Sequence, residues 1–586
     1  MTKDNTILEV KDLSVAFDGR TVVENVSYTL GRGKTLGIVG ESGSGKSVSS
    51  MALMGLLPKN ATVAGHAWLA GASGLSDRLD LLTLGEAAMQ GIRGKRISMI
   101  FQEPMTSLNP VQKCGEQVSE MLRLHEEVSH EEARRRVIDL FEEVLLPRPE
   151  KIYDSYPHEI SGGQKQRVMI AMALICHPDI LIADEPTTAL DVTVQKAILD
   201  LLRQLQARYH IGIIFITHDL GVVAQIADDV AVMYRGKIVE SGPSRQVLYH
   251  PEHPYTKGLL ACRPPLDSRP RHLPTVEEFL KGERLKVEGE MTGEVDASHL
   301  SPFTSHRSPL LSVRDLSVTY TLKRSFFGKP LQQLNAVDGI SFDIMEGETL
   351  GLVGESGCGK STLGRALLRL ISHSSGSILY RGRPLDTFSA KEMRALRSKM
   401  QIVFQDPYSS LNPRFTIGEA ISEPLRVHKG ERLKVKGENQ NVDNNVSPLT
   451  SHFSPKERVC ALLQQVGLNP DWYGRYPHEL SGGQRQRVCI ARALVLQPEL
   501  LVCDESVSAL DVSVQAQVLN LLNDLKAQYG YTYLFITHDL SVVKFLSDRI
   551  MVMEKGRIVE TGPADRLYAN PEHPYTQRLI AAIPRM

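Results

Sequence analysis

A phosphate-binding pattern, the P-loop G-x-x-x-x-G-K-[ST], occurs twice in this chain, at residues 40–47 and 354–361. Its glycines let the backbone curl so that successive N–H groups face a phosphate, and the following helix adds the positive end of its dipole. The lysine reaches the β- and γ-phosphates, and the final serine offers a hydroxyl to Mg²⁺. Each copy follows an apolar run typical of a strand, at 35–39 and 349–353, as the pattern requires. The candidate phosphate ligands are Gly40, Ser42, Gly43, Gly45, Lys46 and Ser47 in the first copy, and Gly354, Ser356, Gly357, Gly359, Lys360, Ser361 and Thr362 in the second. Two copies in that context predict a nucleotide-binding protein.

Two carboxylates end an apolar strand in each half of the chain: Asp184 and Glu185, and again Asp504 and Glu505. Such a strand delivers its carboxylates to the carboxyl edge of a sheet, where nucleotides bind. We expect the aspartate to hold Mg²⁺, directly or through water. We expect the glutamate to orient or deprotonate the attacking water, a role worth about 10²–10⁴-fold in rate. The alternative, an exposed acid pair at a strand end, is disfavoured by the P-loop that precedes it.

A third pattern, Ser-Gly-Gly-Gln, opens an apolar run with helical spacing in each half. A serine and two glycines at a helix N-terminus can form a second anion site. A helix cap alone would explain the serine but not the repeated Gly-Gly-Gln. The spacing from Ser161 to Asp184 and from Ser481 to Asp504 is the same, 23 residues. The candidate nucleotide ligands are Ser161, Gly162, Gly163 and Gln164, and Ser481, Gly482, Gly483 and Gln484.

Two histidines and two glutamines complete the candidate site residues. His218 and His538 each follow a strand-like run and lie 33 residues beyond the glutamate of their half. A lone histidine after a strand is usually structural, but the matched spacing favours contact with a γ-phosphate. Gln102 and Gln405 are placed to sense Mg²⁺ and the attacking water. The candidate Mg²⁺ ligands are Ser47, Gln102, Asp184, Ser361, Gln405 and Asp504.

These motifs lie on a duplicated chain. Lys46 corresponds to Lys360, and from Ser161 and Ser481 onward the two halves keep a constant offset of 320 residues. Each half reads as a β-rich start, a P-loop with its helix, a helical stretch and alternating strands and helices, which predicts an α/β fold. We predict a first domain at 1–265, a polar linker at 266–309 and a second domain at 310–586, with an insertion at about 429–455.

A short repeat is out of phase with this duplication. Residues 281–290 recur as 429–438, one copy in the linker and one inside the second half. Polar segments of this composition are typical of flexible surface loops. A tolerated insertion is the favoured interpretation, and a docking element is the alternative.

Composition narrows the class. The 586 residues include 67 basic and 68 acidic side chains, so nothing in the charge balance suggests a nucleic-acid partner. Seven scattered cysteines indicate reduced thiols. No apolar run approaches the roughly 18 residues of a membrane span, and the start is no signal peptide. If the protein works at a membrane, other chains must cross it.

In this order and twice over, the motifs resemble those of the ATP-binding cassette family, over nearly the whole chain. The resemblance implies two tandem P-loop nucleotide-binding domains, each with an antiparallel β subdomain, a RecA-like α/β core and a helical subdomain. It further implies head-to-tail pairing, with each ATP between one half's P-loop and the other half's Ser-Gly-Gly-Gln signature. The first site then joins Lys46, Gln102, Asp184, Glu185 and His218 to Ser481 and Gly483, and the second joins Lys360, Gln405, Asp504, Glu505 and His538 to Ser161 and Gly163. Phe17 and Tyr320 are expected to stack on the adenines.

Two stretches in each half indicate which subfamily of ATP-binding cassette proteins the chain resembles. The glutamine loops at 101–110 and 404–413, and the endings His-Pro-Tyr-Thr at 253–256 and 573–576, look like those of bacterial dipeptide, oligopeptide and nickel importers. A fused pair of cassettes is similar to the ATPases of peptide or glutathione uptake. This implies ATP and Mg²⁺ as cofactors, two integral-membrane permease subunits as partners, an extracytoplasmic solute-binding protein acting indirectly, and a peripheral position on the cytoplasmic face of the inner membrane. The transported solute stays open among dipeptides, oligopeptides, glutathione and nickel.

Departures from the family pattern are small: Ile160 replaces a leucine before the first signature, and Ser506 replaces a proline after the second glutamate. Neither removes a reacting group, so two competent sites are expected. Cys358, inside the second P-loop, is expected to have a depressed pKa beside a helix N-terminus, and the alternative is an ordinary small residue. The rival functions are a soluble twin-cassette ATPase acting on ribosomes or nucleic acid, a non-hydrolysing regulatory module, and an exporter.

Overall fold

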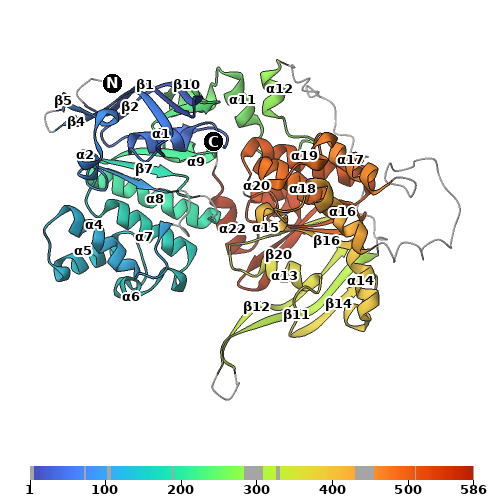
Figure 1. Cartoon of the computed structure of the whole chain (residues 1–586). Helices are drawn as coiled ribbons and strands as arrows, with labels where there is room; N and C mark the ends of the chain where they lie inside the picture. The colour runs from blue at the N-terminus through green and yellow to red at the C-terminus, as the bar shows by residue number, and fades with distance from the viewer. Residues whose placement is uncertain are drawn as a thin grey trace.

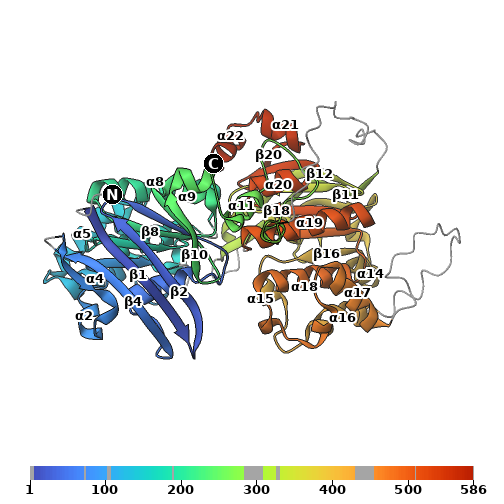
Figure 2. The same cartoon turned by 90° about the horizontal axis from the view of Figure 1, so that it is seen from above.

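A computed structural model describes residues 5–71, 74–101, 107–187, 190–282, 308–324, 330–428, 454–508 and 510–584. It contains two similar α/β units side by side, one from each half of the chain (Figure 1). Seen from above, the two units remain separate bodies joined along one face (Figure 2). Within the described residues, no helix combines the length and apolar character that crossing a bilayer would need. The predicted duplication is therefore visible as two copies of one architecture.

Each unit begins with a four-stranded antiparallel sheet. Its strands alternate buried and exposed side chains, as expected for a sheet with one face on a core. In the first unit the order is β2 (Arg20–Gly31), β1 (Thr6–Phe17), β4 (Ala61–Gly71), β5 (Gly74–Asp80). In the second it is β12 (Pro330–Met345), β11 (Pro309–Arg324), β14 (Ser375–Tyr380), β15 (Arg383–Pro384).

The centre of each unit is a six-stranded sheet whose inner strands are parallel and buried on both faces, which explains their continuous apolar runs. The order in the first unit is β10 (Lys237–Pro243), β9 (Asp229–Tyr234), β3 (Thr35–Val39), β8 (Gly212–Thr217), β7 (Ile180–Asp184), β6 (Ile97–Ile100). In the second it is β16 (Met400–Val403), β17 (Leu500–Asp504), β18 (Thr532–Thr537), β13 (Thr349–Val353), β19 (Arg549–Glu554), β20 (Arg557–Pro563). At one edge of each sheet the last pair is antiparallel, β9 with β10 and β19 with β20, and the other pairs are parallel.

Helices cover these sheets and form a separate helical subdomain in each unit. The first unit contains α1 (Lys46–Leu53), η2 (Leu81–Thr83), α2 (Glu86–Gln90), α4 (Cys114–His125), α5 (His130–Glu143), α6 (Pro149–Asp154), η3 (Pro157–Glu159), α7 (Gly162–Leu174), α8 (Val192–Tyr209), α9 (Leu220–Ile226), α10 (Ser244–Tyr249), α11 (Pro254–Ala261) and α12 (Val276–Leu280). The second contains α13 (Lys360–Leu367), η4 (Leu385–Thr387), α14 (Ala390–Lys399), α15 (Pro407–Ser410), α16 (Ile417–Val427), α17 (Pro455–Gln465), η6 (Pro470–Gly474), η7 (Pro477–Glu479), α18 (Gly482–Leu494), α19 (Val512–Tyr529), α20 (Leu540–Leu546), α21 (Ala564–Ala569) and α22 (Pro574–Ala581).

The two units point in opposite directions. In Figure 1 the antiparallel sheet of the first unit is at the top and its α4–α7 subdomain at the bottom, whereas the second unit has α16–α18 at the top and its antiparallel sheet at the bottom. The P-loop helix of each unit, α1 or α13, therefore lies on the side where the other unit carries its signature helix, α18 or α7.

Part of the predicted polar linker packs against the second unit. Leu273 and Val276 are 1% and 5% exposed and belong to a core cluster that continues into α19 and α20. These two apolar side chains of a largely polar stretch are therefore part of a core that the second unit shares. Most of the short repeat, at 283–290 and 429–438, and nearly all of the predicted insertion lie outside the described residues.

Candidate functional site

The two P-loops connect β3 to α1 and β13 to α13. Gly43 and Gly45 have φ of +77° and +99°, a region that favours glycine. A Cβ on Gly40 would lie 2.2 Å from the carbonyl oxygen of Met233. The second loop repeats these features at Gly354, Gly357 and Gly359. The glycines of the pattern are thus explained by backbone shape and by close approach to the neighbouring strand β9 or β19.

The P-loop lysines lie at the centre of their loops. Lys46 is 5% exposed and donates hydrogen bonds to the carbonyl oxygens of Gly40 and Glu41, at 2.7 and 2.8 Å. Lys360 does the same with Gly354 and Glu355, at 2.7 and 2.9 Å. Burial lowers the pKa of Lys46, while the nearby carboxylate of Glu185 opposes that change. A buried cation surrounded by backbone dipoles is suited to a phosphate ligand.

The P-loop serine and the strand-end aspartate meet in both units. Ser361 Oγ donates to Asp504 Oδ1 at 2.8 Å. Asp184 Oδ1 is buried and has no hydrogen-bond partner within the described residues. Burial raises the pKa of Asp184 and of Asp504, and the hydrogen bonds from Ser47 and Ser361 oppose this rise. A buried carboxylate oxygen beside a hydroxyl is the kind of oxygen set that Mg²⁺ takes, so these residues fit the predicted ion.

Each strand-end glutamate is held in a constrained backbone conformation. Glu185 and Glu505 have φ of +47° and +48°, which is rare for a non-glycine residue. Their amides donate to the carbonyl oxygens of Ile216 and Ile536, both at 2.9 Å. Left-handed backbone of this kind is concentrated at functional sites, where surrounding structure must maintain it.

The histidines lie beside these glutamates. His218 Nδ1 is 3.2 Å from Glu185 Oε1, and His538 Nδ1 is 3.6 Å from Glu505 Oε1. Burial alone would lower the pKa of each imidazole, but the neighbouring glutamate more than offsets it, so both pKa values are raised. Burial alone would likewise raise the pKa of Glu505, but His538 and Lys360 lower it overall.

Of the two candidate glutamines, Gln405 is among the described residues and Gln102 is not. Gln405 Nε2 donates to Glu505 Oε2 at 2.6 Å, so this side chain reaches the glutamate beside the predicted magnesium residues. Gln102 lies outside the described residues. Gln405 is thus joined to the proposed catalytic group, and its contact with Mg²⁺ stays a prediction.

The signature motifs begin α7 and α18 as capping boxes. Ser161 Oγ accepts from the Gln164 amide, and Gln164 Oε1 accepts from the Ser161 amide at 2.9 Å. Ser481 and Gln484 repeat this exchange. The expectation that a cap explains only the serine was wrong, because the cap also explains the glutamine.

The signature glycines remain to be explained. A Cβ on Gly162 or Gly482 would meet no atom within 4 Å, and neither residue has positive φ. Neither packing nor backbone shape requires glycine there, and contact of these glycines with a nucleotide stays a prediction. A Cβ on Gly483 would lie 2.2 Å from Val514 Cγ1, so that glycine is required by packing.

Sequence reasoning did not predict which residues make the contacts between the two units. The Asp511 carboxylate accepts from the Ser42 amide at 2.9 Å, and Asp191 accepts from the Ser356 amide at 2.5 Å. Next to them, Thr193 Oγ1 donates to Glu355 at 2.7 Å, and Ser513 donates to Glu41. The repetition of these residues at equivalent positions of the two halves, 320 residues apart for the aspartates and 314 for the P-loop serines, was the signal that could have drawn attention to them.

A cavity of about 930 Å³ lies between the units, lined by Glu41–Ser44 of the first P-loop and by Ser481, Gly483 and Gln484 of the second signature. Linker residues Thr275–Glu277 form another part of its wall. Ser161 and Gly163 line a separate pocket of about 280 Å³ together with Thr193, which itself contacts the second P-loop. The first P-loop and the second signature thus lie around one cavity. Thr193, which lines the pocket of the first signature, contacts the second P-loop.

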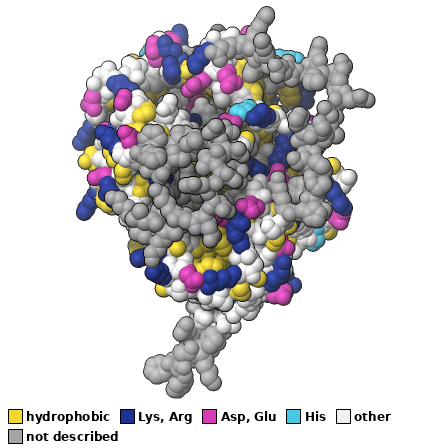
Figure 3. All heavy atoms as spheres, turned by 90° about the vertical axis from the view of Figure 1, so that its right-hand side faces the viewer, with side chains coloured by type: hydrophobic (Ala, Val, Ile, Leu, Met, Phe, Trp, Pro, Cys, Tyr) yellow, Lys and Arg dark blue, Asp and Glu magenta, His cyan; other side chains and the backbone are white. Residues whose placement is uncertain are grey.

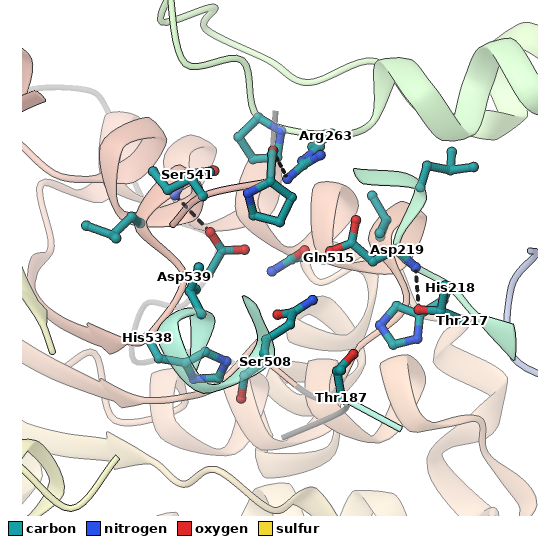
Figure 4. Close-up of a pocket in the computed structure, with 18 of the residues that line it drawn as sticks. Thr187, Thr217, His218, Asp219, Arg263, Ser508, Gln515, His538, Asp539 and Ser541 are labelled. Carbon is teal, nitrogen blue, oxygen red and sulfur yellow. Dashed lines mark hydrogen bonds between the residues drawn. The ribbon is translucent and has the colours of Figure 1, made fainter. Parts of the chain in front are cut away.

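The two histidine-bearing strand ends face a smaller cavity of about 140 Å³ between the units (Figure 4). His218 and Asp219 come from the first unit, and His538 and Asp539 from the second. At one edge of this cavity, Arg263 donates to the carbonyl oxygen of Pro584 of the second unit at 2.9 Å. Both candidate sites therefore adjoin a shared interface.

Three further expectations concern adenine stacking, Thr362 and the pKa of Cys358. Phe17 ends β1, and Tyr320 lies in β11 with 41% of its surface exposed, so adenine stacking stays a prediction for both. Thr362 lies in the first turn of α13. The expected depressed pKa of Cys358 was wrong: the thiol is 7% exposed and burial raises its pKa, although Lys360 opposes this.

A P-loop, an acidic strand and a histidine at the end of the next strand, repeated on two six-stranded sheets, define a tandem P-loop ATPase. The family model described as ABC transporter matches residues 23–188 and 337–508. A second, described as oligopeptide/dipeptide transporter, C-terminal region, matches residues 239–284 and 559–586. The chain belongs to the ABC transporter family and is an ATPase with two ATP-binding cassettes.

Similar curated proteins include the glutathione import ATP-binding protein GsiA of Salmonella choleraesuis (strain SC-B67), which is 47% identical over 594 residues. That of Escherichia coli (strain K12) is 46% identical over 588 residues, and each alignment covers 99% of this chain and 89% of the relative. Among solved structures, the cassette MJ0796 bound to ADP and Pi is 26% identical with a TM-score of 0.36, covering 43% of this chain and 98% of that one.

Proposed function

We propose that each of the two ATP sites is built from both cassettes, with the P-loop of one facing the signature of the other. The observation that carries this proposal is the pair of hydrogen bonds from the Ser42 and Ser356 amides to Asp511 and Asp191 of the opposite unit. The cavity shared by the first P-loop and the second signature supports it. This pairing would couple both sites to the separation of the two units.

Within each site the residues take distinct roles. Lys46 and Lys360 bind the phosphates, and the P-loop amides and signature glycines enclose them. Ser47 with Asp184, and Ser361 with Asp504, would hold Mg²⁺, which offsets charge on the phosphates when bound. Glu185 and Glu505 orient the attacking water and accept its proton. His218 and His538 hold these carboxylates in place, and their contact with a γ-phosphate stays a prediction.

The chain would supply energy to an importer of peptide-type solutes, with glutathione as the first substrate to test. Support comes from the relatives named as glutathione import ATP-binding proteins and from the matched C-terminal region. Two integral-membrane permease subunits would bind it at the cytoplasmic face of the membrane. A solute-binding protein would deliver the substrate from outside. ATP binding would close the two cassettes, and hydrolysis with product release would reopen them.

No observation favours the ribosome or nucleic-acid alternative. On the described part of the face in Figure 3, acidic and basic side chains are interspersed. The described part of this face therefore shows no basic patch of the kind expected for nucleic-acid binding.

Uptake of labelled glutathione tests the proposal. Cells that lack the gene would receive either the wild-type chain or the double variant Glu185→Gln/Glu505→Gln, at matched expression. We expect uptake with the wild type and none with the double variant. Co-purification of two multi-span permeases from gently solubilised membranes should be the same for both. Equal uptake with both chains would contradict the proposal, and co-purifying ribosomal proteins in place of permeases would favour the alternative.

Single variants test whether both sites turn over. We expect Glu185→Gln and Glu505→Gln each to lower the ATPase rate, and the double variant to lower it by about 10²–10⁴-fold. Full activity in Glu505→Gln with complete loss in Glu185→Gln would contradict two competent sites.

A further inference from the structure

The motif His-Pro-Tyr-Thr ends each cassette and has no role in the ATP sites as assigned above, although Tyr255 lines the cavity beside the first P-loop. Its histidine begins the following helix: His253 Nδ1 accepts from the Tyr255 amide at 3.1 Å, and the Glu240 carboxylate accepts from the His253 amide at 3.1 Å. His573 and Glu560 repeat these contacts in the second cassette. Histidine and proline thus fix where the helix starts, and the direction of the tyrosine follows from that.

The tyrosine reaches the P-loop. Tyr255 is completely buried, and its hydroxyl accepts a hydrogen bond from the Glu41 amide at 3.1 Å and donates to the Glu41 carboxylate at 3.3 Å. Tyr575, 3% exposed, accepts from the Glu355 amide at 3.0 Å. Burial raises the pKa of both phenols, so each hydroxyl is neutral and can both donate and accept.

Glu41 and Glu355 are the second residues of their P-loops, and each also contacts the opposite cassette. The Glu41 carboxylate accepts from Ser513, and the Glu355 carboxylate accepts from Thr193. One P-loop residue therefore joins the C-terminal tyrosine of its own cassette to a helix of the other.

We propose that Tyr255 and Tyr575 are positioning residues for ATP, each fixing the start of a P-loop so that the next amides face the phosphates. The proposal rests on the composite sites proposed above. The hydroxyl accepts from the amide of the second P-loop residue, and it thereby fixes the orientation of the peptide groups that follow. In the first cassette, the Tyr255 hydroxyl also donates to the Glu41 carboxylate and so orients it toward the opposite cassette.

Removing only the hydroxyl tests this role, one site at a time. Tyr255→Phe would be studied in the Glu505→Gln background, where only the first site hydrolyses, and Tyr575→Phe in the Glu185→Gln background. We expect KM for ATP to rise about three- to tenfold, the equivalent of one lost hydrogen bond, with kcat changed by less than about twofold. Each tyrosine provides an independent test if the other variant folds poorly.

Tyr533→Phe is the matched control. Tyr533 is fully buried, and its hydroxyl donates to the carbonyl oxygen of Leu522, within the core of the second cassette. We expect Tyr533→Phe to lower the melting temperature by an amount similar to Tyr575→Phe but to leave KM unchanged. An unchanged KM in both P-loop variants, or an equal rise in the control, would overturn the positioning role.

Lys46→Ala in the Glu505→Gln background separates this proposal from the site assignment. Loss of ATPase activity in Lys46→Ala with a normal KM in Tyr255→Phe overturns the positioning role alone. Retained activity in Lys46→Ala overturns the site assignment and the positioning role with it.

Discussion

One buried asparagine makes two of the hydrogen bonds that hold the linker on the second cassette. Asn520 is 9% exposed on α19, and its Oδ1 accepts from the Leu273 amide while its Nδ2 donates to the Leu273 carbonyl oxygen, both at 2.8 Å. Lys544 of α20 adds a hydrogen bond to the Leu266 carbonyl oxygen. At the equivalent positions the first cassette has Asp200, which is exposed, and Ala224. Only the second cassette therefore has side chains matched to this segment.

Asn520→Ala should release the linker. The substitution leaves two buried backbone groups of Leu273 without partners, and each such group costs about 1–3 kcal/mol. Water reaches the groups once the segment lifts, so the expected loss lies near the lower end, about 2–3 kcal/mol. That loss corresponds to a roughly 30- to 150-fold increase in the population of the undocked segment.

Hydrogen exchange at the Leu273 amide measures this population directly, because exchange follows local opening. We expect exchange in Asn520→Ala to be faster by that factor, with little change in the central sheets. Asp200→Ala is the control, and its effect should stay within about 0.5 kcal/mol. Unchanged exchange at Leu273, or the same acceleration in Asp200→Ala, would refute the assignment of docking energy to Asn520. The result also bears on ATP binding, because Thr275–Glu277 line the cavity that holds the first P-loop.

Three further predictions follow from the sites. Gly482→Ala should leave the melting temperature unchanged or slightly higher, because its Cβ meets open space, yet it should lower ATPase activity. Gly483→Ala should lower the melting temperature, because its Cβ would meet Val514. Equal ATPase activity in Gly482→Ala and wild type would argue against a ligand at that glycine. The raised pKa of His538 means that its pairing with Glu505 contributes stability fully below about pH 6.5, its unfolded value, and loses it as pH rises through the higher folded value. Urea unfolding of wild type and His538→Gln from pH 6 to 9 should therefore converge as pH rises, and a constant difference would contradict this. Cys358→Ser should keep ATPase activity within about twofold of wild type, because the first P-loop has Ser44 at the equivalent position. Maleimide should modify the buried Cys358 thiol slowly even without ATP, and rapid modification would show that the thiol is accessible.

Local sequence determined much of this protein. The strands at 35–39 and 349–353 were predicted to the residue, because strands buried on both faces read as unbroken apolar runs. The P-loop glycines were predictable because positive φ at Gly43 and close approach at Gly40 exclude other residues. The signature helices were predictable because their capping boxes are completed within four residues.

Other features depended on contacts between residues far apart in the chain. Ser42 and Asp511 are 469 residues apart, and no periodicity or composition joins them. The polar composition of the linker concealed the docking of Leu273, since two apolar side chains hardly change the character of a segment. Tyr255 could be noticed as part of a repeated motif, but its contact with the P-loop follows only from how α11 packs against the sheet. A side chain's local backbone requirements are encoded beside it, whereas its distant partners are decided by the packing of the whole chain.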